Sequence, residues 1–492
     1  MTSSTPQPPL KSPLKFSAFV MDTTSHILHG AWRLPEAQQH NFNDLDHWVN
    51  LAKTLEDAKF DVIFFADVVG LYSDYQGGWK KFVDTGLQIP SNDPLVLASA
   101  IAAATENLGI AITSSPIQSP PFDFARKLST LDHATRGRIA WNIVTSASEN
   151  AWRNYGYDGL TAHDDRYALA DEYLDVLYKL WEGSWEDGAL IQDKESGLHA
   201  DYSRVHKINH VSEHYRVEGP HLVSPSPQRT PVLFQAGSSP TGRRFAARNA
   251  EAQFITSPSP EAAASLIADT RRLVADAGRP PEDLTFFQGL SFVVGSTEEE
   301  ARRKAAELDE VIDPATILAH GAGGTGIDLG NYDLDTPIGD LETQGTQSTF
   351  LWLRETVQGR EPTVRDLAEI RSRSGRVVGT PEQIADNLAR WRDAGVGGIN
   401  VINATIPGSY VEFAEHVLPV LRERGLAQRE YTPGTTRFKI TGRDRLPDSH
   451  PAAAYRGAFT GQADTARSAA ATASRTSPVS TTPSAAQTTA TS

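Results

Sequence analysis

Eight short apolar runs, each followed by an amphipathic stretch, are the feature of this sequence that most constrains its fold. The runs are rich in Val, Ile and Phe and lack a clean polar alternation, which is typical of parallel strands buried on both faces. The predicted strands are Phe16–Met21, Asp61–Ala66, Gly109–Thr113, Arg138–Thr145, Pro231–Gln235, Ala252–Thr256, Thr285–Val294 and Gly398–Asn403.

The stretches between these strands have helical periodicity. In Leu45–Ala58, for example, apolar residues recur three and four positions apart, which predicts one buried helical face. Thr380-Pro381-Glu382-Gln383 has the composition of a helix start, with a Thr cap and Pro in the first turn. The other predicted helices are Phe124–His133, Asp165–Trp181, Pro260–Ala277 and Pro381–Asp393.

Strands that alternate with helices form either a closed (β/α)₈ barrel or an open doubly wound sheet. We predict the α/β class and the TIM barrel, because the strand count is eight and several strands end in polar residues. In a barrel these ends converge on one site. The polar ends are Asp67, Thr113–Ser115, Thr145–Ser146 and Ser238–Ser239.

Composition sets the limits of the predicted barrel. Residues 1–14 and 456–492 are polar and poor in large apolar side chains, so we expect disordered tails. The barrel should span residues 15–440, with insertions near 185–230 and 305–375 that are too long for simple loops.

The overall charge and the absence of certain residues exclude several classes of protein. A net charge of −15 argues against binding to nucleic acid or to an anionic membrane. No apolar run is long enough to cross a membrane, and the polar N-terminus lacks the core of a secretory signal. The chain has no cysteine, so thiolate catalysis and thiolate metal sites are excluded. We therefore expect a cytoplasmic enzyme.

Two motifs match the patterns of a dinucleotide site and a metal site, but the residues around them do not favour these functions. Gly321–Gly326 fits the GxGxxG pattern, but a helical stretch precedes it where a dinucleotide site needs a strand. We expect a flexible loop there, able to act as a lid. His206, His210 and His214 have the spacing of metal ligands on a helix, yet the Val- and Ile-rich context favours a β-hairpin. We predict packing or surface histidines and no metal site.

Polar residues at the expected barrel mouth are better candidates. Ser238 and Ser239 begin a helix whose free N–H groups could hold a phosphate, although a plain N-cap explains them equally well. Asp67 ends a very apolar strand, where barrel geometry favours a site residue over a cap. His163 and Tyr167 are i, i+4 partners near a helix start, and either ligand binding or simple packing accounts for them.

In combination, eight short stretches of this sequence resemble the flavin-dependent monooxygenases of the bacterial luciferase superfamily. The likeness is to the branch that contains nitrilotriacetate monooxygenase, dibenzothiophene-sulfone monooxygenase and the pristinamycin synthase subunit. It covers roughly residues 15–430 in order. The stretches that carry it are His29–Arg33, Phe64–Asp67, Leu108–Thr113, Leu131–Arg138, Trp141–Ser146, His163–Tyr167, Gln235–Ser239 and Pro407–Tyr410.

The resemblance implies a barrel that takes reduced FMN from a separate NAD(P)H:flavin reductase and uses O₂ as co-substrate. It implies that Asp67 and Thr113 flank the flavin ring and that Ser146, a catalytic candidate, lies near its reactive edge. The other catalytic candidate, His29, is implied to line the substrate side. The implied ligands of the ribityl phosphate are His163, Tyr167, Ser238 and Ser239, and the implied substrate-pocket residues are Trp32 and Phe254.

We therefore predict a two-component FMNH₂-dependent monooxygenase that acts on a small, mostly apolar compound, as in xenobiotic degradation. The loop Leu71–Pro94, with Tyr72, Tyr75 and Trp79, is particular to this chain and is expected to shape the substrate pocket. Aromatic, organosulfur and halogenated molecules fit better than a polycarboxylate, because such segments are aromatic and not basic. We also expect a homo-oligomer. The alternatives are a deazaflavin-dependent oxidoreductase on the same barrel and a non-catalytic flavin-binding barrel.

Overall fold

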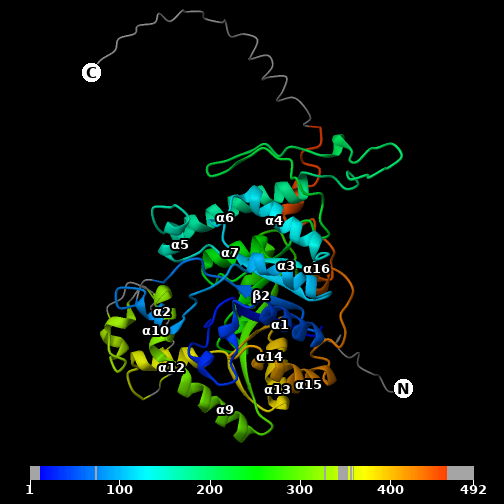
Figure 1. Ribbon diagram of the computed structural model, residues 1–492. Coiled ribbons are helices and arrows are strands. Elements are labelled where there is room, and N and C mark those ends of the chain that lie inside the picture. Colours follow the sequence, from blue (N-terminus) through cyan, green and yellow to red (C-terminus); the bar gives the residue numbers. More distant parts are fainter. Residues whose placement is uncertain are drawn as a thin grey trace, which may run out of the picture.

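A computed structural model describes residues 12–72, 75–325, 328–341, 353–354, 357 and 359–461. Eight parallel strands close into a barrel, because β1 pairs with β2 on one side and with β11 on the other (Figure 1). All eight predicted strands are confirmed. They are β1 (Lys15–Met21), β2 (Val62–Ala66), β3 (Gly109–Ser114), β4 (Ile139–Ile143), β7 (Val232–Gln235), β8 (Ala252–Ile255), β9 (Thr285–Val294) and β11 (Gly398–Ile402).

Helices surround this barrel, as the sequence predicts. Their apolar faces pack against the outer side chains of the strands in one large core, while Phe19, Phe64, Phe234 and Phe287 fill the interior. The helices are α1 (Leu45–Asp57), α2 (Lys80–Thr85), α3 (Pro94–Ala104), α4 (Pro121–Ala134), α5 (Glu149–Asn154), α6 (His163–Tyr178), α7 (Pro240–Asn249), α8 (Pro260–Asp276), α9 (Glu298–Val311), α10 (Pro314–Thr325), α12 (Val364–Arg373), α13 (Pro381–Asp393), α14 (Gly408–Glu412), α15 (Leu418–Glu423) and α16 (Thr436–Thr441).

The predicted helix start at Thr380 is confirmed in detail. The Thr380 hydroxyl accepts from the Gln383 backbone N–H, and the Gln383 side chain accepts from the Thr380 N–H, which together form a capping box. Pro381 follows in the first turn. Two donors that would otherwise lack partners at the helix end are thereby satisfied.

Strand β10 (Arg376–Gly379) is a ninth strand that the sequence analysis missed. It pairs with Ser291–Val294, the end of β9 that extends past the register of β11. An unpaired strand edge is thereby covered. β10 is short and half-exposed, so it lacks the continuous apolar run by which the other strands were recognised.

The expectation of a flexible loop at Gly321–Gly326 is wrong for residues 321–325, which form the last part of α10. A Cβ atom at Gly321 would collide with the Arg371 guanidinium of α12, so glycine permits this close helix contact. The pattern is thus not a strand–loop–helix nucleotide motif. Residue 326 lies outside the described part of the chain.

The two predicted insertions flank the barrel. The first contains the expected hairpin, β5 (His210–Val211) with β6 (Arg216–Val217), and it projects from the barrel beside the C-terminal segment (Figure 1). His206, His210 and His214 bond to Glu186, Ser212 and Glu172 respectively. The second insertion holds α10 and α12.

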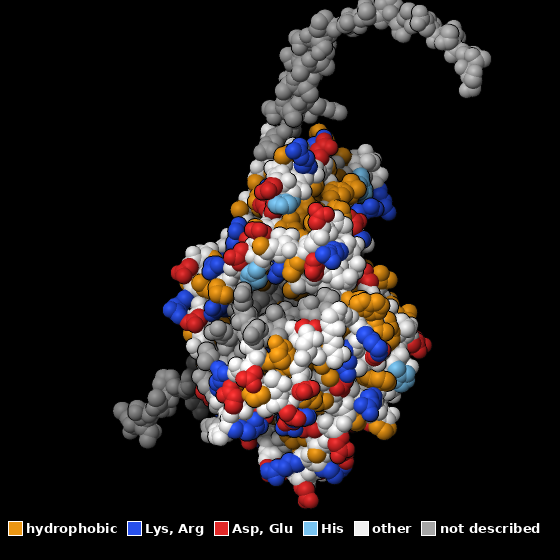
Figure 2. Space-filling view, turned by 90° about the vertical axis from the view of Figure 1, so that its left-hand side faces the viewer, with side chains coloured by type: hydrophobic (Ala, Val, Ile, Leu, Met, Phe, Trp, Pro, Cys, Tyr) orange, Lys and Arg blue, Asp and Glu red, His pale blue; other side chains and the backbone are white. Residues whose placement is uncertain are grey.

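The C-terminal segment stays ordered beyond the predicted limit of the barrel. Residues 456–461, which the sequence analysis placed in the tail, pack on the barrel: Arg456 binds Glu182, and Phe459 is buried. Residues 1–11 and 462–492 lie outside the described part of the chain. No helix among the described residues is long and apolar enough to cross a membrane. Acidic and basic side chains mix on the face seen in Figure 2.

Candidate active site

Two adjoining cavities lie at the carboxyl ends of β2, β4 and β7, where barrel enzymes carry their sites. One of them, of about 290 Å³, is lined by Asp67, Tyr72, Ser146, Tyr167 and Gly237, among others. Asp67 also lines the second cavity, next to the start of α3. The structure thus brings together three residues predicted for the site from distant parts of the sequence: Asp67, Ser146 and Tyr167.

The predicted phosphate ligands meet at the start of α7. Ser239 caps this helix by accepting from the Gly242 N–H, and its Oγ lies 3.2 Å from Nε2 of His163. The His163 ring in turn packs on Tyr167, with 5.2 Å between ring centroids. Ser238 is exposed, so its hydroxyl is available to a ligand. Ser239 therefore has a structural role whether or not it also binds a ligand.

The turn between β7 and α7 forms a cradle of backbone beside Tyr167. A Cβ atom at Gly237 would stand 2.5 Å from the Tyr167 hydroxyl oxygen, and one at Gly242 would stand 2.7 Å from it. Gln235 and Gln253 fix the turn, because one accepts from the Gly237 N–H and the other donates to the Gly237 carbonyl. Glycine at both positions therefore lets the Tyr167 hydroxyl approach the backbone of this turn closely, beside the start of the helix.

A buried polar atom near the carboxyl ends of β3 and β4 has no partner among the described residues. Thr113 at the end of β3 is buried and donates to the Phe65 carbonyl, while it accepts from Asn142 Nδ2. The Asn142 Oδ1 atom is buried without a partner. A buried acceptor without a donor costs free energy unless a ligand supplies the donor, and the N–H groups of a flavin ring are such donors.

These features fit FMN. The cradle and helix start suit the phosphate, the exposed Ser238 hydroxyl adds a donor, and Asn142 suits the ring. Among the described residues, no group of three His, Asp or Glu side chains could hold a metal ion.

Burial, with a further contribution from the nearby carboxylate of Asp93, raises the pKa of Asp67 to about 7. Asp67 is therefore largely a neutral acid below that pH. A neutral acid can donate a hydrogen bond, whereas the ionised form would add negative charge to a cavity suited to an anionic ligand.

Ser146 has a left-handed backbone, with a φ of 44°. This conformation is uncommon for a residue other than glycine and persists where the surroundings hold it. Here Trp152 Nε1 donates to the Ser146 carbonyl at 2.9 Å. The constraint keeps Ser146 on the cavity wall.

The remaining predicted residues lie further from these cavities. His29 is 1% exposed, and its Nδ1 and Nε2 atoms bond to Ser25 and His320 at 2.7 and 3.0 Å. Phe254 packs against Phe19 in the barrel interior, with 4.9 Å between ring centroids. Trp32 is half-buried in a short 3-10 helix (Ala31–Arg33).

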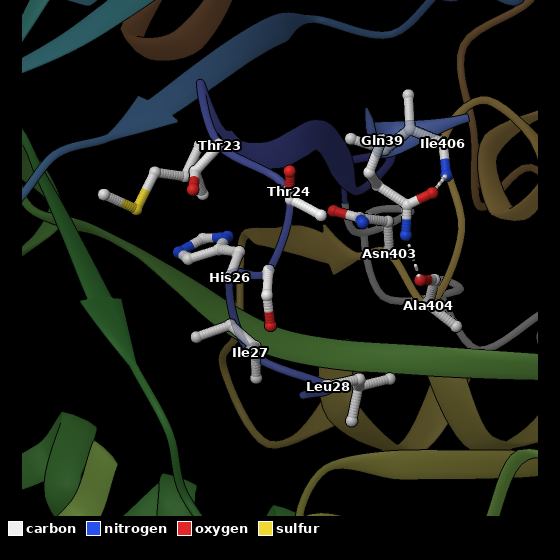
Figure 3. A pocket seen from close by; sticks show the side chains of 11 residues that line it. Thr23, Thr24, His26, Ile27, Leu28, Gln39, Asn403, Ala404 and Ile406 are labelled. Carbon is white, nitrogen blue, oxygen red and sulfur yellow. Dashed lines mark hydrogen bonds between the residues drawn. The ribbon is translucent and has the colours of Figure 1, made fainter. Parts of the chain in front are cut away.

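A small cavity, large enough only for water, separates the segment after β1 from the loop after β11. Figure 3 shows Gln39 beside it, donating to the Ala404 carbonyl and accepting from the Ile406 N–H at 2.8 and 3.0 Å. His26 lines the same cavity on the side away from Gln39, and burial lowers its pKa to about 3. Gln39 thus links the segment after β1 to the loop after β11.

Sequence reasoning missed several polar residues of the site. Asn142, Gln235 and Gln253 each stand within or at the end of a strongly apolar strand. A polar side chain in such a strand has to be hydrogen-bonded or face a ligand. Gln88 gave no comparable signal, because its loop has no regular pattern.

Comparisons with known proteins agree with this geometry. The family model "Luciferase-like monooxygenase" matches residues 21–398. The dimethyl-sulfide monooxygenase of Hyphomicrobium sulfonivorans is 43% identical over 92% of this chain and 96% of its own length. The crystal structure of DmoA from that organism superimposes with a TM-score of 0.86 at 42% identity, covering 95% of this chain and 99% of that one.

Two further relatives act on quite different compounds according to their names. The long-chain alkane monooxygenase of Geobacillus thermodenitrificans is 42% identical over 90% of this chain and 98% of its own length. Component A of the nitrilotriacetate monooxygenase of Aminobacter aminovorans is 35% identical over 84% and 93%. The branch expected from the sequence is thus related, but at lower identity than the sulfide and alkane enzymes.

Proposed function

Since this chain belongs to the luciferase-like monooxygenase family, we propose that it oxygenates a small, mostly apolar compound with O₂ and reduced FMN. The chain is a flavin-dependent monooxygenase. The observation that carries the FMN proposal is the cradle of Gly237, Gly242 and Tyr167 at the start of α7, which opens into the cavity lined by Asp67 and Ser146.

Each predicted cofactor residue has a task in this proposal. Ser238 and the N–H groups at the start of α7 bind the phosphate, with His163, Tyr167 and Ser239 beside it. Asn142, held by Thr113, accepts from the flavin ring. When bound, reduced FMN supplies the two electrons with which one oxygen atom of O₂ enters the substrate and the other leaves as water.

The protein's own groups position the reactants and exclude water. Asp67, in its neutral form, offers a proton at the cavity wall. Ser146 faces the same cavity at the end of β4, where we place the reactive edge of the ring. Trp32 and Phe254 remain proposed substrate contacts on the β1 and β8 side.

The substrate class follows from the lining. Apart from Asp67, the described residues around the cavity are apolar or neutral, and they include no Lys or Arg that would pair with a polycarboxylate. Substrates like those of the sulfide and alkane monooxygenases therefore suit the site better than nitrilotriacetate. Of the predicted classes, we favour organosulfur compounds over aromatic or halogenated ones, on the name of the sulfide relative. The name of the second relative adds alkanes, a class that the sequence analysis did not include.

We further propose that a separate NAD(P)H:flavin reductase supplies the reduced FMN. The designation "component A" in the name of the nitrilotriacetate enzyme supports a two-component system. Binding through a turn at the barrel mouth, and not in a closed interior, suits a flavin that arrives and leaves in each cycle.

The proposal is tested with chemically reduced FMN, the purified protein and O₂, offered a panel of dialkyl sulfides, n-alkanes and aromatic sulfides. We expect one compound class to yield an oxygenated product by mass spectrometry without any NADH. The purified protein should be nearly colourless and bind reduced FMN more tightly than oxidised FMN. Retention of stoichiometric oxidised FMN through dialysis would contradict the two-component proposal.

A further inference from the structure

A chain of five hydrogen-bonded side chains runs from the cavity wall into the protein. The Tyr72 hydroxyl donates to Gln88 Oε1 at 3.2 Å, and Gln88 Nε2 lies 3.3 Å from His320 Nε2. His320 Nδ1 is 3.0 Å from His29 Nε2, and His29 Nδ1 is 2.7 Å from Ser25 Oγ. Only Tyr72, at one end of this chain, lines the 290 Å³ cavity.

One backbone atom fixes the donor-to-acceptor direction of this whole series of hydrogen bonds. Gln88 Nε2 lies 3.1 Å from the His26 carbonyl oxygen, which can only accept, so the amide nitrogen must face it. The second N–H of that nitrogen points to His320 Nε2, which therefore accepts. Gln88 itself is held in a left-handed conformation, with a φ of 52°, and is 8% exposed.

The protonation states of the two imidazoles, His320 and His29, complete this assignment. Burial lowers the pKa of His320 to about 4, with a further contribution from Arg371, and lowers that of His29 well below its usual range. Both rings are neutral at pH 7, so His320 donates from Nδ1 to His29, and His29 donates from Nδ1 to Ser25. Every bond in the chain thus points away from the cavity.

We propose that this one-way chain makes Tyr72 a specificity-determining residue, which presents an accepting oxygen to the cavity and favours a product bearing an O–H donor. The proposal rests on the proposed monooxygenase function and deepens it. Because the Tyr72 proton is committed to Gln88, a ligand that needs a donor would leave the Gln88 oxygen without one. Gln88, His320 and His29 are positioning residues in this scheme.

The inference separates two outcomes of oxygenation. Insertion of one oxygen atom into a C–H bond gives an alcohol, with the two electrons from reduced FMN and the second oxygen atom leaving as water. Transfer of the same atom to a sulfide gives a sulfoxide, whose oxygen only accepts. An alcohol product could therefore donate to Tyr72, whereas a sulfoxide product could not.

The direction of the chain is tested first, without substrate. In ¹⁵N-histidine-labelled protein, with resonances assigned through single-histidine variants, His29 and His320 should both be neutral Nδ1–H tautomers between pH 6 and 8. An Nε2–H tautomer at either position would overturn the proposal. This result does not depend on whether the protein oxygenates anything, so it fails separately from the proposed function.

The selectivity of Tyr72 is tested with 2-hexanol and 2-hexanone, which share a carbon skeleton. By NMR titration in the presence of oxidised FMN, the alcohol should bind about tenfold more tightly than the ketone. Tyr72→Phe should bring this ratio close to one, and so should Gln88→Leu, in which Tyr72 keeps its hydroxyl but is free to donate. Tyr202→Phe, at a residue that is 75% exposed, is the matched control. An equal or reversed preference in the wild type would overturn the proposal.

Discussion

Two groups of polar residues at opposite ends of the barrel differ in how fully they are hydrogen-bonded. At the end opposite the site, Arg437 of α16 is completely buried and binds both carboxylate oxygens of Glu251, at 2.7 and 3.0 Å. Its remaining N–H groups donate to the Gln228, Thr230 and Pro231 carbonyls. At the mouth, by contrast, the Asn142 and Gln253 side-chain oxygens are buried without partners, and Ser238 is exposed.

This difference predicts that the first group contributes to the stability of the fold and the second to ligand binding. A buried charge with an ideal partner cannot be removed without leaving the other charge uncompensated. A polar atom left unpartnered next to a cavity already carries its cost, and a ligand relieves it. Substitutions at the Arg437 end should therefore change unfolding, whereas substitutions at the mouth should change ligand affinity. Barrel enzymes in general divide their two faces in this way.

The largest effect is expected for Arg437→Met. The substitution leaves Glu251 buried without its partner and should lower the free energy of unfolding, measured by urea titration, by about 3–5 kcal/mol. The affinity of the folded protein for reduced FMN should not change. The double variant Arg437→Met/Glu251→Met is the control and should regain most of the loss. Weaker FMN binding at unchanged stability would break the comparison.

Ser238→Ala is the corresponding change at the mouth. A hydrogen bond to a charged phosphate contributes about 1.5–3 kcal/mol, so reduced FMN should bind roughly 10- to 150-fold more weakly. Riboflavin lacks the phosphate, so its own weaker binding should barely change. Anaerobic titration of both reduced flavins measures the difference. Equal losses for the two would remove Ser238 from the phosphate site.

A smaller effect is expected from the ionisation of Asp67. Its pKa of about 7 predicts that affinity for reduced FMN falls, by up to about tenfold, as the pH rises through 7 and the carboxylate becomes charged. The folded pKa lies above the unfolded value of 3.8. The contribution of Asp67 to stability is thus present below pH 3.8 and is lost as the pH rises through about 7. Asp67→Asn should flatten both dependences, and an unaltered affinity profile would exclude Asp67 as their source.

The fold was more predictable from the sequence than the site. Each barrel strand is a continuous apolar run because it is buried on both faces, so all eight were found. β10 escaped because it covers only one edge of β9 and stays half-exposed. The end of α10 was mistaken for a loop because Gly321 is a poor helix former. Its contact with the end of the Arg371 side chain is visible only in the structure.

At the site, the residues found were those that end strands or start helices, such as Asp67, Ser146 and Ser239. The apolar strand or the helical pattern next to each of them in the sequence predicts its position at the barrel mouth. The chain from Tyr72 to Ser25 could not be found in this way, because Gln88 and His320 are 232 residues apart in sequence and meet only through the folded loops. The spacing of these residues along the sequence does not predict such a contact.

The smallest effect, and the sharpest use of the comparison, is expected for Ser239→Ala. Ser239 stands next to Ser238 but caps α7, with 3.0 Å between the Gly242 nitrogen and the Ser239 Oγ. Loss of an N-cap costs about 1 kcal/mol of stability, so this variant should lower the free energy of unfolding slightly. It should also weaken the binding of FMN and of riboflavin to the same small extent, because the start of α7 becomes less well fixed for either ligand. Ser239→Asp, which restores a capping oxygen, should recover the stability but weaken FMN selectively, since its charge would face the phosphate. If Ser239→Ala instead reduced FMN binding as strongly as Ser238→Ala and left riboflavin unaffected, both hydroxyls would be phosphate ligands, and the separation of cap from ligand within these two adjacent residues would fail.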